Sequence, residues 1–322
     1  MTYDESMEGI EWNFVEWLRG QPARNPATLL GIGDDMAVVS TGSRGGAPGR
    51  TEANRVLLSS DMLLDEVHFD TARHALALIG RKAIACSLSD CAAMAVRPLA
   101  ATVSLALPAS FGLADAQELF RGMLAIAAEY ALAIVGGDTT RWSHPLAIDV
   151  AIAATPYEGI EPVCRSGARR GDRLFVTGLL GGSLLGRHLT FPPRVDEARG
   201  LAAALGPALH AMMDISDGLS LDLWRMCQAS NVGARLDEDL LGRVISEDAR
   251  RSAAADGRAA LEHALADGED FELLLALGPD AATAGDGTLP TLYRIGHVTE
   301  AGLSIVRCDG RTEPLAPKGY LH

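Results

Sequence analysis

The sequence has no cysteine pair with the spacing of a metal knuckle or a redox motif. Its five cysteines form no CxxC pair and no regular framework, which favours free thiols in a reducing compartment. No apolar run reaches the about 18 residues that a membrane span needs. The first 21 residues also lack a basic stretch followed by an apolar block, as a signal peptide would have. We therefore expect a cytoplasmic protein with no membrane partner.

The usual nucleotide-binding loops are absent too. There is no GxxxxGK[ST] sequence, which excludes a P-loop, and no kinase-type glycine loop with its partner motifs. The net charge of −14 argues against a nucleic-acid partner, because phosphate backbones recruit lysine and arginine. An ATP site in so acidic a chain would need divalent cations between its carboxylates and the phosphates.

A length of 322 residues predicts two domains. Strands and helices alternate, which favours mixed sheets covered by helices, of the α/β and α+β classes. A turn-rich stretch, residues 155–172, places the boundary between domains 1–155 and 156–322. Helices are expected at residues 6–18, 75–95, 114–131, 195–205 and 218–229. Strands are expected at 36–40, 55–59, 101–107, 133–135, 145–154, 173–177, 271–277 and 293–298 and before Asp214, and residues 41–54 should form a hairpin tip or loop.

Aspartates recur where the predicted apolar strands end, and one more lies inside an apolar helix. They are Asp34, Asp35, Asp61, Asp138, Asp214 and Asp217, with Asp90 in the helix. Any one of them could simply cap a helix or make a turn. Gathered in one site they would repel each other unless cations compensated, and Mg²⁺ prefers carboxylates together with phosphate oxygens and water. The pattern therefore predicts a metal–nucleotide site.

Eight short motifs, in order along the chain, resemble those of the thiamine-monophosphate kinase family. They are residues 31–35 (GIGDD), 59–63 (SSDML) with 67–69 (VHF), 88–94 (LSDCAAM), 136–141 (GGDTTR), 165–167 (RSG), 214–219 (DISDGL), 268–273 (GEDFEL) and 318–320 (KGY). The resemblance implies the two-domain fold of the aminoimidazole-ribonucleotide-synthetase-like superfamily and a homodimer. The N-terminal domain would bind ATP and Mg²⁺ and form the dimer, and the C-terminal domain would complete the nucleotide and substrate site.

The reaction implied by this resemblance is direct transfer of the ATP γ-phosphoryl group to thiamine phosphate, with several Mg²⁺ ions and no covalent enzyme intermediate. The residues that match the Mg²⁺ ligands of the family are Asp35, Ser59, Ser60, Asp61, Asp90, Asp138, Asp214 and Asp217. Those that match ATP contacts are Gly137, Asp138, Arg165 and Ser216, and those that match substrate-binding positions are His68, Glu269 and Tyr320. No side chain is assigned as a general base, because the acceptor phosphate oxygen is already anionic.

Some residues depart from the pattern of the family, and other functions remain open. Asp267 stands where the family usually has glycine, which places a negative charge beside the substrate loop. The alternatives are another ATP-dependent synthetase of the superfamily, a non-catalytic nucleotide sensor, or a protein that uses its carboxylates only to hold Mg²⁺ or Ca²⁺. The absence of cysteine before Cys86 argues against a selenophosphate synthetase.

Overall fold

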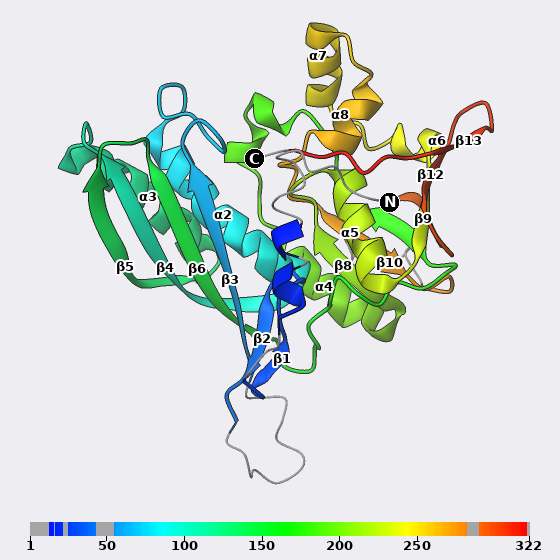
Figure 1. Ribbon diagram of the computed structural model, residues 1–322, viewed down its shortest axis with the longest axis horizontal. Helices are drawn as coiled ribbons and strands as arrows, with labels where there is room; N and C mark the ends of the chain where they lie inside the picture. The colour runs from blue at the N-terminus through cyan, green and yellow to red at the C-terminus, as the bar shows by residue number, and fades with distance from the viewer. Residues whose placement is uncertain (1–12, 16, 22–24, 43–54, 282–289, 321–322) are drawn as a thin grey trace.

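The computed structural model describes residues 13–15, 17–21, 25–42, 55–281 and 290–320, and within them the strands form two mixed sheets (Figure 1). The six strands of the first sheet run in the order β1-β2-β3-β6-β4-β5. Their bounds are β1 (Thr28–Leu30), β2 (Ala37–Ser40), β3 (Arg55–Leu64), β4 (Val96–Pro108), β5 (Ala133–Trp142) and β6 (Ala147–Pro156). Among the described strands of this sheet, β4 and β5 run parallel to each other, and the other neighbouring pairs are antiparallel.

Burial alternates along the central strand β6, as expected for a sheet covered on one face. Ile148, Val150 and Ile152 are buried, whereas the residues between them are only half-buried. Two helices, α2 (Leu76–Ala93) and α3 (Leu113–Glu129), pack against the apolar face. They cross closely because each has a glycine there: a Cβ on Gly80 would lie 2.0 Å from the Leu119 carbonyl oxygen, and a Cβ on Gly122 would lie 1.8 Å from that of Ala77.

The second sheet has seven described strands in the order β13-β12-β9-β11-β7-β10-β8. Their bounds are β7 (Arg173–Val176), β8 (Leu209–Asp214), β9 (Gly233–Asp237), β10 (Leu273–Leu277), β11 (Tyr293–Thr299), β12 (Leu303–Val306) and β13 (Thr312–Pro314). The helices of this half are α4 (Val195–Leu205), α5 (Leu219–Ser230), α6 (Glu238–Leu241), α7 (Glu247–Asp256) and α8 (Ala260–Ala266). The described residues of this half also form three short 3-10 turns: η1 (Ser183–Leu185), η2 (Arg187–Leu189) and η3 (Gly206–Ala208).

Helix α2 joins the two halves. It lies on the first sheet and also contacts α4, η2 and strand β8 of the second half (Figure 1). One apolar cluster accordingly runs from Ile84 and Leu88 of α2 to Leu201 of α4 and Met212 of β8. Any polar side chain that α2 directs toward β8 is therefore placed between the two sheets.

Most expected elements are present, and the expected mixed sheets covered by helices are confirmed. Strand β4 begins at Val96 instead of Ala101. The carboxyl ends of two other strands were also wrong: β3 continues to Leu64 instead of stopping before Ser60, and β5 continues to Trp142 instead of ending at Val135. Pairing with β6 and β4 carries both strands through their polar residues. The predicted helix at 6–18 falls partly outside the described residues, and the loop at 41–54 almost entirely so. The division into domains at residue 155 stays a prediction.

Candidate metal and substrate site

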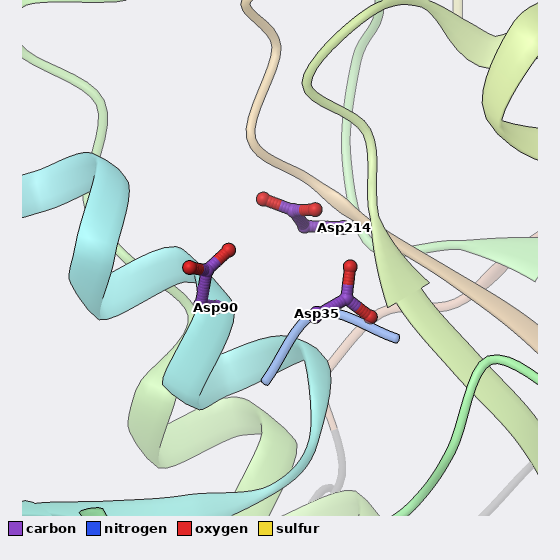
Figure 2. Close-up of side chains that lie close together, drawn as sticks. All are labelled: Asp35, Asp90 and Asp214. Carbon is purple, nitrogen blue, oxygen red and sulfur yellow. The ribbon is translucent and has the colours of Figure 1, made fainter. Parts of the chain in front are cut away.

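Three aspartates from separate parts of the chain converge between the sheets (Figure 2). Asp35 lies two residues before the start of β2, Asp90 lies in the last turn of α2, and Asp214 ends β8. One carboxylate oxygen from each lies within 4.8 Å of those of the other two. The sequence predicted this convergence for these three residues. Their spacing allows them to share a divalent cation or to bridge neighbouring ones.

The electrostatics of this aspartate triad are unfavourable without a cation. Burial raises the pKa of Asp90 well above its usual range, and the charges of Asp61, Asp214 and Asp35 raise it further. Burial and the charge of Asp35 do the same for the pKa of Asp214. Oδ2 of Asp35 is also buried, with no hydrogen-bond partner among the described residues. A convergent set of buried and half-buried carboxylates with an unsatisfied oxygen fits Mg²⁺, a hard cation that takes oxygen ligands.

Polar neighbours hold the triad in place. The Ser89 hydroxyl donates to Asp214 across 2.6 Å, and Arg165 donates to Asp35 across 2.5 Å. The Arg165 amide donates to Asp34 across 3.1 Å. Ser59 lies close enough to Asp90 to lower its pKa, although it makes no hydrogen bond of ordinary geometry. Arg165, predicted to contact ATP, is thus paired with a predicted metal ligand.

Strand alternation divides the predicted ligands of β3 between two faces. Asp61 pairs in register with buried Val150 and accepts a hydrogen bond of 2.6 Å from Ser87 of α2, so it faces the covered side of the sheet. Burial raises its pKa. Ser60 points to the opposite face, where its hydroxyl donates to Asp149 across 2.8 Å. Ser59 and Asp61 therefore lie on the side of the aspartate triad, and the Ser60 side chain does not.

Asp138 is not brought together with the triad. It lies on β5 and pairs with Ser104 of β4, which in turn pairs with Asp149 of β6. Asp149 pairs with Met62 of β3, the residue after Asp61, so Asp138 and Asp61 are offset by one residue in the register of the sheet. The Asp138 side chain is exposed. The preceding Gly137 has a φ of 152°, and a Cβ there would lie 1.8 Å from the Val103 carbonyl oxygen, so only glycine fits. The predicted roles of Gly137 and Asp138 toward ATP and metal stay predictions.

Asp217, the predicted ligand of a further Mg²⁺, forms an ion pair with Arg225 of α5. Arg225 also donates to Asp222 across 2.9 Å, and Asp222 accepts the backbone amides of Asp217 and Gly218 at 3.0 Å each. Burial raises the pKa of Asp222 to about 7. Sequence reasoning did not find Arg225 or Asp222, because their importance depends on which loop α5 packs beside.

A cavity of about 390 Å³ opens where β3 extends past β2. It brings together predicted residues from both halves of the chain and adds others that were not predicted. The lining residues are Ser60, Asp61, Met62, Leu63, His68, Cys86, Ser216, Asp217, Glu269 and Phe271. Burial raises the pKa of the Cys86 thiol well above its usual range, which leaves it protonated and poorly nucleophilic.

His68 and Tyr320 were both predicted to bind substrate; His68 lines this cavity, and Tyr320 bonds to Val67, the residue before His68. Nδ1 of His68 accepts the Leu64 amide at 3.0 Å, so the proton of the neutral ring is on Nε2. The Tyr320 hydroxyl donates to the carbonyl oxygen of Val67, across 2.5 Å, and its amide donates to that of Asp217. Burial and the neighbouring charge of Glu269 raise the pKa of Tyr320. The end of the chain thus joins the loop after β3 to the loop after β8.

Glu269 is buried and forms an ion pair with Lys82 of α2. Lys82 was missed by sequence reasoning; its signal was a single lysine within the predicted apolar helix at 75–95. The Asp267 carboxylate points away from the cavity, toward the Gly182 amide at 3.0 Å and Nδ1 of His263 at 2.9 Å. The charge that Asp267 places beside the substrate loop therefore helps to anchor that loop.

Comparison with known proteins gives two family-model matches. Residues 33–156 match the model described as AIR synthase related protein, N-terminal domain, and residues 167–309 match the corresponding C-terminal domain. A thiamine-monophosphate kinase of Rhodopirellula baltica is 41% identical over 97% of both chains. One from Synechococcus elongatus is 32% identical over 90% of both chains.

A solved structure has the same fold along almost the whole chain. It is described as AaThiL complexed with AMPPCP and TMP. The two structures superpose with a TM-score of 0.79 and 26% sequence identity, and the match covers 99% of each chain. Within the described ranges, none of the helices has the length and apolar character that crossing a membrane would require.

Proposed function

The chain belongs to the thiamine-monophosphate kinase family, and we propose that it transfers the γ-phosphoryl group of ATP to thiamine phosphate, giving thiamine diphosphate and ADP. The convergence of Asp35, Asp90 and Asp214 is the observation that carries the proposal at this site. These residues would hold Mg²⁺, with Asp61 and Ser59 beside them. Bound Mg²⁺ would neutralise charge on the transferring phosphoryl group.

The side chains around the cavity have the chemistry to bind the acceptor. His68, Glu269 and Tyr320 surround or adjoin it from three separate segments, which suits a small ligand that needs orientation. Arg165 is planar and carries several donors, so it can exchange Asp35 for a phosphate oxygen when ATP binds. The acceptor oxygen is anionic, so this transfer needs no side chain to remove a proton.

The test is ADP production with and without thiamine phosphate, first in Mg²⁺ and then in EDTA. The proposal predicts turnover only when thiamine phosphate, ATP and Mg²⁺ are all present. ATP binding without turnover would identify a nucleotide sensor. Turnover with a different acceptor, in a screen of phosphorylated metabolites, would identify another enzyme of the superfamily.

We also propose a homodimer formed through the first sheet. The face of this sheet opposite α2 carries Leu58 and Met62, which are 46% and 62% exposed, and the edge strand β5 carries Val135, which is 65% exposed. Such apolar surface suits a second copy of the chain. Light scattering after size exclusion should give twice the mass of one chain, 33.9 kDa. Met62→Glu should give the monomer, and a monomeric wild type would contradict the proposal.

A further inference from the structure

Lys82 lies in the middle of α2, is 0% exposed, and makes contacts to three segments that are far apart in sequence. Its ammonium group donates to the His68 carbonyl oxygen at 2.6 Å and lies 3.4 Å from Nδ1 of His188. The third contact is the ion pair with Oε2 of Glu269. A lysine ammonium has three N–H groups, and each has an acceptor here. The side chain is therefore fixed in one position.

The neighbouring histidine cannot replace Lys82 as the cation. Burial and the charge of Lys82 lower the pKa of His188 to about 3, so its ring is neutral and Nδ1 acts as an acceptor. Nδ1 of His188 is also 3.9 Å from Oε2 of Glu269, beyond hydrogen-bond distance. Lys82 is thus a cation that directly compensates the buried carboxylate of Glu269.

The backbone at Glu269 is also constrained. Its φ is 58°, in the left-handed region that a residue with a side chain seldom adopts, and its amide donates to the Ser216 carbonyl oxygen at 2.6 Å. Glu269 is 4% exposed and lines the cavity. A carboxylate buried this far would take up a proton or turn away if no cation faced it. The loop alone therefore does not explain how Glu269 is kept ionised.

We propose that Lys82 is a positioning residue for the substrate: from behind the cavity wall it holds Glu269 ionised and oriented, so that Glu269 presents an acceptor to the N–H donors or positive charge of the substrate's heterocycle. The proposal rests on the function proposed above. Lys82 acts through Glu269. His68 and His188 fix where the ammonium lies. The triad at Asp35, Asp90 and Asp214 involves other residues, so Lys82 should affect acceptor binding and not ATP binding.

Steady-state kinetics of Lys82→Met test this role. The KM for thiamine phosphate should rise about 10- to 100-fold, the loss expected when a charged hydrogen bond is disrupted. The KM for ATP should stay within about twofold, because Lys82 does not contact the triad. A KM for thiamine phosphate that stays within about twofold of wild type would overturn the proposal. Arg170→Met, which removes an exposed ion pair with Glu300, is the control.

A double-mutant comparison separates positioning from a direct role and guards against poor folding of Lys82→Met. Lys82→Met/Glu269→Gln removes both buried charges together, which a fold tolerates better than one unpaired charge. If Lys82 acts through Glu269, the double variant and Glu269→Gln should have KM values within about twofold of each other. A further tenfold rise in the double variant would overturn the proposal, because Lys82 would then act without Glu269.

The wild-type enzyme in the same experiment keeps the two proposals apart. Wild-type turnover that depends on thiamine phosphate, together with an unchanged KM in Lys82→Met, contradicts only the role of Lys82. No turnover of thiamine phosphate by the wild type contradicts the proposed function and, with it, the role of Lys82.

Discussion

The Ser89 hydroxyl lies 2.6 Å from Oδ2 of Asp214 and donates to it, in a buried contact between α2 of the first half and β8 of the second. Ser89 directly precedes Asp90, so one turn of α2 supplies both a candidate metal ligand and the donor that orients another. The metal site therefore forms only when α2 is packed against β8. The geometry of the metal site therefore depends on the contact between the two halves of the chain.

Ser89→Ala should raise the Mg²⁺ concentration needed for half-maximal activity by about tenfold, because a hydrogen bond to a charged group is lost and Asp214 is less well oriented. An Mg²⁺ titration of ADP production measures this. Ser304→Ala, which removes a hydroxyl on β12 near the Ala234 carbonyl oxygen, serves as the control. An unchanged Mg²⁺ requirement in Ser89→Ala would show that the contact does not support the metal site.

Asp90→Asn should lower turnover by at least about 100-fold, since it removes a charge from the site that stabilises the transferring phosphoryl group. In EDTA, however, Asp90→Asn should unfold at a higher denaturant concentration than the wild type. Its free energy of unfolding should be about 1–3 kcal/mol larger, because the carboxylates of the triad no longer repel each other as strongly. Asp138→Asn should leave stability in EDTA unchanged, because Asp138 is exposed. If Asp90→Asn were less stable than the wild type in EDTA, the claim that the carboxylates of the triad repel one another would be contradicted.

His188 should make stability fall at acid pH. Burial lowers its pKa from 6.5 to about 3, so below pH 6.5 the unfolded chain takes up a proton that the folded chain does not. The folded state loses up to about 1.4 kcal/mol per pH unit between pH 6.5 and 3 from this group. The free energy of unfolding, measured in urea from pH 5 to 7.5, should change less with pH in His188→Asn than in the wild type. Asparagine keeps an acceptor for Lys82. Equal slopes in the two proteins would rule this contribution out.

Two substitutions of Tyr320 separate its ring from its hydroxyl. Tyr320→Phe removes the hydroxyl, which donates to the Val67 carbonyl oxygen, and should raise the KM for thiamine phosphate a few-fold, through the loop that carries His68. Tyr320→Ala also removes the ring and should raise it by about tenfold or more. The KM for ATP should change little in either. A selective effect on the KM for ATP would place Tyr320 at the nucleotide instead.

The convergence of Asp35, Asp90 and Asp214 could be predicted from the sequence. Asp35 and Asp214 were placed at the ends of predicted strands and Asp90 in an apolar helix, and such positions come together where a helix packs against the ends of the strands. Sequence reasoning placed Asp61 wrongly at a strand end, since polar residues interrupt the apolar pattern while pairing with β6 continues. The alternation of Ser59, Ser60 and Asp61 would have shown that their side chains cannot all face one site.

Partnerships between distant segments were the part that could not be predicted. Lys82 and Glu269 are 187 residues apart, and Arg225 acquires its role only because α5 packs beside the loop that carries Asp217. No local pattern encodes such pairs. Asp267 shows the same limit: its position beside Gly268 suggested the substrate cavity, but its carboxylate bonds with Gly182 and His263.

The location of bound Mn²⁺, as a substitute for Mg²⁺, tests the central claim most directly. Crystals grown with Mn²⁺ and a non-hydrolysable ATP analogue should show anomalous density within about 2.3 Å of carboxylate oxygens of Asp35, Asp90 and Asp214. Crystals of Asp90→Asn grown under the same conditions should show weaker anomalous density at this site. Full Mn²⁺ occupancy elsewhere, with none at these three carboxylates, would contradict the account.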